Sequence, residues 1–209
     1  SSSACAGRLI GSHATYDVGP GQTHEDMQTV PWLSLQAGDV VNIHARFNAD
    51  GTPKPYRTQV ALRPKATAAK PIYINGVTDG DCRRPVIDGD GAKTANDAAA
   101  AHFGSYGISG HGPRDYGAQS LGLFLLWALG DEPVYDAKGH WTPSYITFQN
   151  LELRNARSTK TFKNSDGGTT AWSHGVSAIY AVLANHLTVE NCVIEGNDQE
   201  NLLIGLDGD

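Results

Sequence analysis

Cationic and aromatic side chains that can do chemistry are concentrated in one stretch of the chain, residues 154–174. Guanidinium and ammonium groups hold carboxylates, an indole stacks on a sugar ring, and a suitably placed base removes a proton. This set therefore favours the recognition or cleavage of an acidic sugar polymer, although the same composition also fits a solvated surface loop. The residues concerned are Arg154, Arg157, Lys160, Lys163, Trp172 and His174.

A second loop, residues 130–144, carries aromatic and charged side chains of the same kinds. If both loops flank one face, they form a groove with aromatic and charged walls, whereas ordinary turn chemistry is the alternative. Tyr180 lines that groove if Ile179 points inward, and otherwise it stacks on the side chains of neighbouring strands. We expect substrate binding by Trp141, Trp172, Arg154, Lys160 and Tyr180, and the catalytic candidates are Arg157, Lys163 and His174.

Acidic side chains near the C-terminus, Asp198, Glu200 and Asp207, are the weak candidates for a metal site. Calcium takes carboxylate ligands, and adjacent strands can bring such ligands together. No EF-hand spacing is present, so turn chemistry is the alternative reading. The eight histidines show no paired-ligand spacing, and the chain has neither a nucleophile elbow nor a phosphate-binding loop. Calcium is therefore the one cofactor considered, without a defined site.

Two segments that must position these residues share one pattern, YITFQNLELRN at 145–155 and HLTVENCVIEG at 186–196. Ile146 aligns with Leu187 and Phe148 with Val189, at a constant offset of 41 residues (187 minus 146). Alternation of apolar residues on each side of an asparagine predicts two short strands that bury one face. The offset predicts that the two segments lie side by side in register.

The asparagine in each segment marks a bend, because the apolar spacing changes from two to three across it. Asparagine tolerates the left-handed backbone region that such a bend requires. Asn150 and Asn191 would then stack as a ladder of side-chain amides. A third strand completes each repeat, with Ile179 of 176–183 beside Leu202 or Leu203 of 201–206, and the run 121–129 precedes them.

These repeats predict an all-β chain, specifically a right-handed parallel β-helix, a solenoid with long lateral loops and an uncapped C-terminal end. We expect one domain, residues 1–209, with an N-terminal cap over 1–34, coils over 35–91 and 121–209, and an excursion over 92–120. Within the cap, a short helix over 23–30 is predicted, with Thr23 as its N-cap and Pro31 ending it. The uncapped end suggests an incomplete C-terminus.

Bulk properties exclude several classes of partner. The net charge of −6 argues against duplex nucleic acid, and no run of about 20 apolar residues is present to span a membrane. The small residues that open the chain fit a mature N-terminus, so we expect a secreted, extracellular or periplasmic protein. In such a compartment Cys5 and Cys82 are the preferred disulfide pair, three free thiols being the alternative, and Cys192 fits a core position.

The chain resembles the pectate-lyase-like superfamily of right-handed parallel β-helix proteins. The segments AGDVVNIHARF, PYRTQVALRP, PIYINGV and PVIDGDG look like its opening coils, and YITFQNLELRN and LTVENCVIEGN look like its repeating core. The superfamily's Trp-Ile-Asp-His signature aligns with Thr188 to Asn191, but it is not intact there, because only the acid is kept, as Glu190. The resemblance implies lyase-like binding or cleavage of an acidic polysaccharide in a lateral groove. The alternative is a structural extracellular protein that assembles through its open end, by self-stacking or with a second chain.

Overall fold

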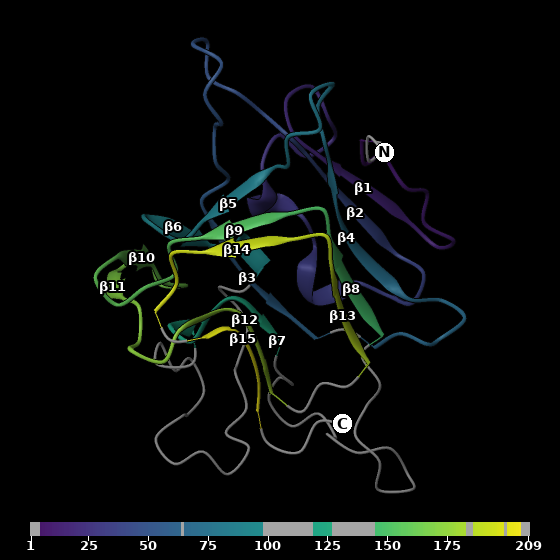
Figure 1. Ribbon diagram of the computed structural model, residues 1–209. Helices are drawn as coiled ribbons and strands as arrows, with labels where there is room; N and C mark the ends of the chain where they lie inside the picture. Colours follow the sequence, from purple (N-terminus) through teal and green to yellow (C-terminus); the bar gives the residue numbers. More distant parts are fainter. Residues whose placement is uncertain are drawn as a thin grey trace, which may run out of the picture.

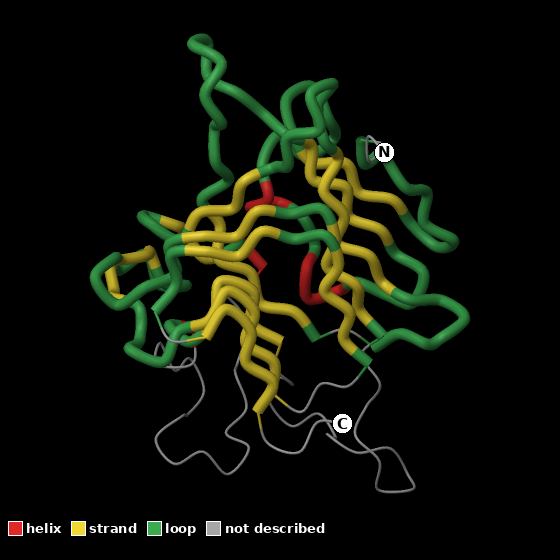
Figure 2. Tube along the Cα trace, viewed as in Figure 1, coloured by secondary structure: helices red, strands yellow, loops and turns green. Residues whose placement is uncertain are grey.

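In the residues that it describes, the computed structural model is mostly β, with three sheets and two complete short helical turns (Figures 1 and 2). It describes residues 5–63, 65–97, 119–126, 145–182, 186–198 and 200–205. The strands are short, and the most buried apolar residues lie on the sides of the sheets that face one another.

The first sheet contains five parallel strands in the order β1-β2-β4-β8-β13. Along β8, Ile146 and Phe148 are fully buried, whereas the alternate residues Thr147 and Gln149 are partly exposed. This alternation is the strand periodicity that the sequence displays. The bounds are β1 (Thr15–Val18), β2 (Val40–His44), β4 (Ile72–Val77), β8 (Ile146–Gln149) and β13 (Leu187–Glu190).

The second sheet contains seven strands in the order β11-β10-β6-β3-β7-β12-β15, and the third contains three in the order β14-β9-β5. All their pairs are parallel except the antiparallel pair β10–β11. In the second sheet lie β3 (Thr58–Leu62), β6 (Ala92–Thr94), β7 (Gly122–Leu126), β10 (Thr161–Lys163), β11 (Thr169–Ala171), β12 (Ser177–Val182) and β15 (Glu200–Gly205). In the third lie β5 (Val86–Asp88), β9 (Glu152–Arg154) and β14 (Val193–Glu195).

The core is formed by apolar side chains from all three sheets. Phe124 of β7 meets Phe148 of β8 edge to face at 5.2 Å, and it meets Trp32 at 6.2 Å. Leu153 of β9 is also fully buried in this cluster. Edge-to-face aromatic pairs add about 0.5–1.5 kcal/mol beyond the area that they bury. The core therefore ties the sheets to the chain around Trp32.

The prediction of a right-handed parallel β-helix is wrong. The described strands form three sheets of unequal size, with five, seven and three strands, in mixed parallel and antiparallel pairing, and they do not close into a solenoid. The error has a physical origin. Apolar alternation and a constant offset specify which strands pair, but they specify neither the closure of the sheets nor their handedness. Residues 206–209, on which the expected uncapped end rests, lie outside the described part of the chain.

The N-terminal capping helix was also predicted wrongly. Residues 23–30 contain only the 3-10 turn η1 (Met27–Thr29), which Asp26 caps through a hydrogen bond from the Met27 N–H at 2.7 Å. A second turn, η2 (Trp32–Ser34), follows Pro31. Three residues suffice to bury Met27 and Trp32, so the chain does not need a longer helix there. The expected excursion over 92–120 likewise begins with a strand, β6.

The pairing predicted from the repeats is confirmed. Leu187 pairs with Ile146 and Val189 with Phe148 between β13 and β8. Asn150 and Asn191 adopt φ angles of 58° and 50°, in the left-handed region, and the Asn191 amide donates to the Asn150 Oδ1 at 2.7 Å. The open question of the third strand is resolved, because Ile179 pairs with Leu202.

The N-terminal segment, residues 5–14, lies across the outer side of the first sheet. The Leu9 N–H donates to the Asn42 Oδ1 at 3.0 Å, and the Gly7 carbonyl accepts from the Asn75 amide at 3.0 Å. A disulfide joins Cys5 to Cys82, the pair preferred from the sequence, and Cys192 is a free, half-buried thiol. We call residues 5–14 the N-terminal strap. In the described part of the chain, no helix has the length and hydropathy to cross a membrane.

Candidate functional site

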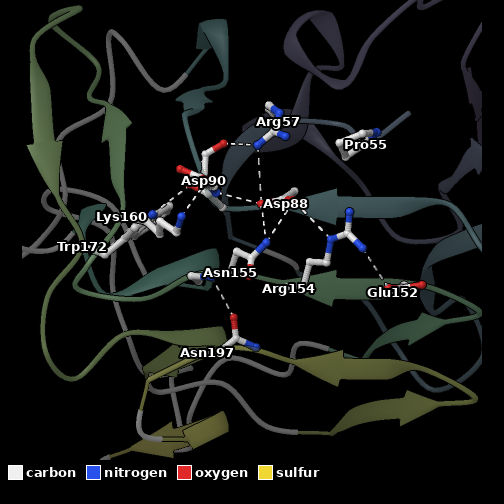
Figure 3. Close-up of polar contacts among 12 residues, drawn as sticks. Pro55, Arg57, Asp88, Asp90, Glu152, Arg154, Asn155, Lys160, Trp172 and Asn197 are labelled. Atoms are coloured by element: carbon white, nitrogen blue, oxygen red, sulfur yellow. Dashed lines mark hydrogen bonds and ion pairs between the residues drawn. The ribbon is translucent and has the colours of Figure 1, made fainter. Parts of the chain in front are cut away.

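Polar side chains from the second and third sheets, and from the turns beside them, converge around Asp88, the last residue of β5 (Figure 3). The Asp88 carboxylate accepts hydrogen bonds from the Arg154 Nε at 3.1 Å, from the Asn155 Nδ2 at 3.1 Å and from the Asp90 N–H at 2.9 Å. A guanidinium nitrogen of Arg57 lies 3.6 Å away. We call this group, together with Lys160, the Asp88 cluster.

Local geometry explains why these residues meet. β5 and β9 are parallel neighbours in register, with Asp88 directly beside Arg154. Asn155 then turns with a φ of 62°, which brings its amide back over Asp88. Gly89 follows Asp88, and a Cβ there would come within 2.8 Å of the Asn155 carbonyl oxygen. Close packing of two turns therefore requires glycine at position 89.

The cluster hides its central negative charge and presents cations outward. The Asp88 side chain is 4% exposed, whereas those of Arg57, Arg154 and Lys160 are 46%, 31% and 39% exposed. Lys160 pairs with Asp90 at 3.0 Å, and Arg154 also contacts Glu152 at 3.4 Å. A buried carboxylate must be paired and hydrogen-bonded, and Asp88 satisfies both conditions.

Two further cations lie outside the Asp88 cluster, on the neighbouring strands β6 and β10. Lys93 of β6 and Lys163 of β10 are direct partners in the parallel pair, and both are exposed. Neither forms an ion pair with any residue in the described part of the chain. Like charges at paired positions destabilise a sheet slightly, so an unscreened lysine pair marks a place where an anion is favourable.

Trp172 belongs to the framework of this region and not to its surface. Its ring stacks on Phe162 of β10 at 4.2 Å, its indole N–H donates to the Gly89 carbonyl at 2.9 Å, and the residue is 2% exposed. No face of the indole is open to a sugar ring, so the predicted stacking role is wrong. The buried indole holds the β10–β11 hairpin against the turn that follows Asp88.

The catalytic candidates do not converge on one point. Arg157 lies 4.0 Å from Asp198, whose carboxylate also accepts the Ser158 N–H. A hydrogen bond from the Ser158 side chain is the largest cause of the lowered pKa of Asp198, and the bond from the Ser158 N–H adds to it. His174 is exposed near the same carboxylate, whereas Lys163 lies on β10. The geometry thus gives Asp198 and Arg157 a part in holding the turn after β9.

The remaining predicted site residues are placed as follows. Tyr180 of β12 is partly exposed beside the buried Ile179, and burial raises the pKa of its hydroxyl. Trp141 and Asp207 lie outside the described residues, and so does the side chain of Glu200. Across the described ranges, no group of three or more histidine, cysteine or acidic side chains could hold a metal ion. Calcium therefore stays a prediction.

Sequence reasoning found Arg154 and Lys160 but missed Arg57, Asp88 and Asn155. Asp88 stands in PVIDGDG, where acids beside glycine read as turn residues. The available signal was register: once PVID is placed as a strand beside LELRN, Asp88 falls next to Arg154.

Comparisons with known proteins identify no relative. No protein-family model matches the chain, and neither a curated protein nor a solved structure does. The resemblance to the pectate-lyase-like superfamily is therefore still a prediction from sequence segments.

Proposed function

We propose that the protein binds an acidic polysaccharide at the Asp88 cluster. The observation that carries the proposal is the outward display of Arg57, Arg154 and Lys160 around a concealed carboxylate. Arginine forks match carboxylates in two-point hydrogen bonds, and an ammonium group adds a mobile point charge. These groups suit a uronate polymer, which combines carboxylates with vicinal hydroxyls.

The charge of the whole chain restricts where a polyanion can bind. A protein with net charge −6 repels a polyanion over most of its surface, so binding requires a local concentration of cations. Lys93 and Lys163 extend that concentration beyond the cluster on β6 and β10. The disulfide between Cys5 and Cys82 is of a kind that persists in oxidising compartments. It supports the proposal that the protein acts outside the cytosol, where such polymers occur.

Calorimetric titration with oligogalacturonate tests the proposal. Saturable binding is expected for the natural chain, and the double variant Arg57→Ala, Lys160→Ala is expected to bind about tenfold or more weakly. Added salt should weaken the natural interaction, because the contacts are ionic and partly exposed.

The matched control is Lys54→Ala, Lys70→Ala, which removes the same charge from two exposed lysines with no ion pair in the described part of the chain. Its affinity should stay within about twofold of the natural value, because rim charges away from a site act only at long range. Equal losses in both double variants, or equal binding of a neutral oligosaccharide, would refute a specific site. Shorter oligomers released during the titration would show that binding leads to cleavage.

A further inference from the structure

The Asp88 cluster contains a carboxylate that cannot itself reach a ligand. Asp88 is 3% exposed, and its oxygens are occupied by the Asp90 N–H, the Asn155 amide and Arg154. A buried acid beneath exposed arginines has one of two effects. It either cancels their charge and weakens anion binding, or it holds their forks in place and strengthens binding.

Topology favours the second effect. Arg154 is the last residue of β9 in the third sheet, whereas Arg57 immediately precedes β3 in the second sheet. Free arginine side chains lose about 2 kcal/mol of rotamer entropy when a ligand fixes them. Asp88 engages one edge of each guanidinium in advance, so less of that entropy is lost on binding.

The outer edges of both guanidiniums stay available. Arg154 uses its Nε on Asp88 and one terminal nitrogen on Glu152, and its other terminal nitrogen forms no hydrogen bond or ion pair in the described part of the chain. Arg57 reaches Asp88 and the Asp90 carbonyl through a single terminal nitrogen. Its Nε and second terminal nitrogen are likewise without a partner among described residues. Both arginines thus keep guanidinium donors that a ligand could engage.

We infer that Asp88 is a positioning residue for the anion site, orienting Arg57 and Arg154 so that both address one ligand carboxylate. This inference rests on the proposed function and deepens it. It implies that the ligand is recognised by the planar geometry of its carboxylates, as in a uronate, and not by negative charge alone.

Two isosteric substitutions give opposite expectations. Asp88→Asn removes one negative charge from the Asp88 cluster, so charge alone predicts tighter oligogalacturonate binding, whereas loss of positioning predicts binding about tenfold weaker. Asp90→Asn also removes one negative charge, but the only ion pair that it breaks is the one with Lys160. This variant should therefore bind oligogalacturonate at least as tightly as the natural chain. The titrations are done on variants whose thermal unfolding shows that they are folded.

If Asp88→Asn does not fold, Arg154→Lys is the second test, because it keeps the positive charge at position 154 and leaves Asp88 in place. It removes the fork that bonds Asp88, and it should also weaken binding by about tenfold. Tighter binding by folded Asp88→Asn, or unchanged binding by Arg154→Lys, would overturn the positioning role while leaving the proposed function intact. A natural chain that binds no oligogalacturonate would remove both.

Discussion

Asp17 shows how one side chain can tie the N-terminal strap to the sheet beneath it. It accepts hydrogen bonds from the Arg8 Nε at 2.8 Å and from a terminal nitrogen of Arg8 at 2.6 Å, and His44 lies 3.1 Å away. The bond from Arg8 is the largest cause of a pKa below the ordinary value of 3.8, and the bond with His44 adds to it. The ionised form of Asp17 therefore stabilises the folded chain.

The sign of that effect gives a pH-dependent prediction. Because the pKa of Asp17 is lower in the folded chain, its stabilisation is present above 3.8 and is lost as the pH falls through the folded value. Asp17→Asn should lower the free energy of unfolding at neutral pH by about 1–2 kcal/mol, and the difference should shrink on acidification. Urea unfolding of both proteins at several pH values measures this. A difference that stays constant with pH would contradict it.

At the residue scale, the sequence predicts chemistry better than it predicts orientation. Lys160 and Arg154 were identified because cations gathered in one segment, and both lie in the Asp88 cluster. Trp172 was misassigned because an indole in a polar loop looks available to a ligand. Its burial depends on Phe162 and Gly89, which the sequence does not place beside it.

At the element scale, a row of asparagine amides links four strands or strand ends of the first sheet. Asn191 donates to Asn150, Asn150 to Asn75, and Asn75 to Asn42, at 2.7, 3.1 and 2.9 Å. Gln149 also donates to the Asn75 Oδ1 at 3.0 Å. The buried Asn75 is therefore the central member of the row.

Substitution of Asn75 tests the importance of the row. Asn75→Ala leaves the amides of Gln149 and Asn150 without their acceptor, so the free energy of unfolding should fall by about 2–4 kcal/mol. Asn48→Ala is the control, because Asn48 lies in an exposed turn and its bonds are local. Chemical unfolding followed by circular dichroism compares the two. Equal, small losses would show that the row is dispensable.

Pairing was predictable at this scale, and the smaller elements were not. Two well-alternating segments separated by a constant offset specified β8, β9, β13 and β14 and their register. β9 and β14 have only three residues each, but they belong to repeated segments, whereas β6, β10 and β11 are equally short and lie in no repeat that would reveal them. The antiparallel hairpin β10–β11 inside the expected loop was missed for this reason, and it is part of what makes the pairing mixed.

At the scale of the whole molecule, the disulfide closes a long segment of chain. Cys5 and Cys82 are separated by 77 residues, and a cross-link of this length restricts the unfolded chain strongly. Cys5→Ser should therefore lower the free energy of unfolding by about 2–5 kcal/mol, and reductant should bring the natural chain to the same value.

Cys192→Ser is the matched control for the loss of a sulfur atom. Cys192 is a free thiol whose pKa burial raises, so its replacement should alter stability less than that of Cys5. Reductant should destabilise Cys192→Ser as much as it destabilises the natural chain, because the Cys5–Cys82 disulfide is intact in both. Thermal unfolding with and without reductant measures all three proteins. A reductant effect that persists in Cys5→Ser would argue against this disulfide as its source.

Assembly through an open end stays a prediction at the same scale. β13, β14 and β15 each end their sheet, and Val193 and Leu202 there are both 37% exposed. Light scattering over a range of concentrations distinguishes a growing particle from one that keeps the monomer mass of 22.2 kDa.

The row of amides has a direction, because each Nδ2 donates towards the strap and each Oδ1 accepts from the donor on the opposite side, the Oδ1 of Asn42 also accepting the Leu9 N–H. One terminus is set by the Leu9 carbonyl, which accepts from Asn42 at 2.9 Å, and the other by Arg84, which donates to the Asn191 Oδ1 at 2.6 Å. Rotating any single amide by half a turn would set oxygen against oxygen on one side and hydrogen against hydrogen on the other. The orientation is consequently all-or-none, and a backbone carbonyl and a guanidinium more than 70 residues apart jointly determine its sense.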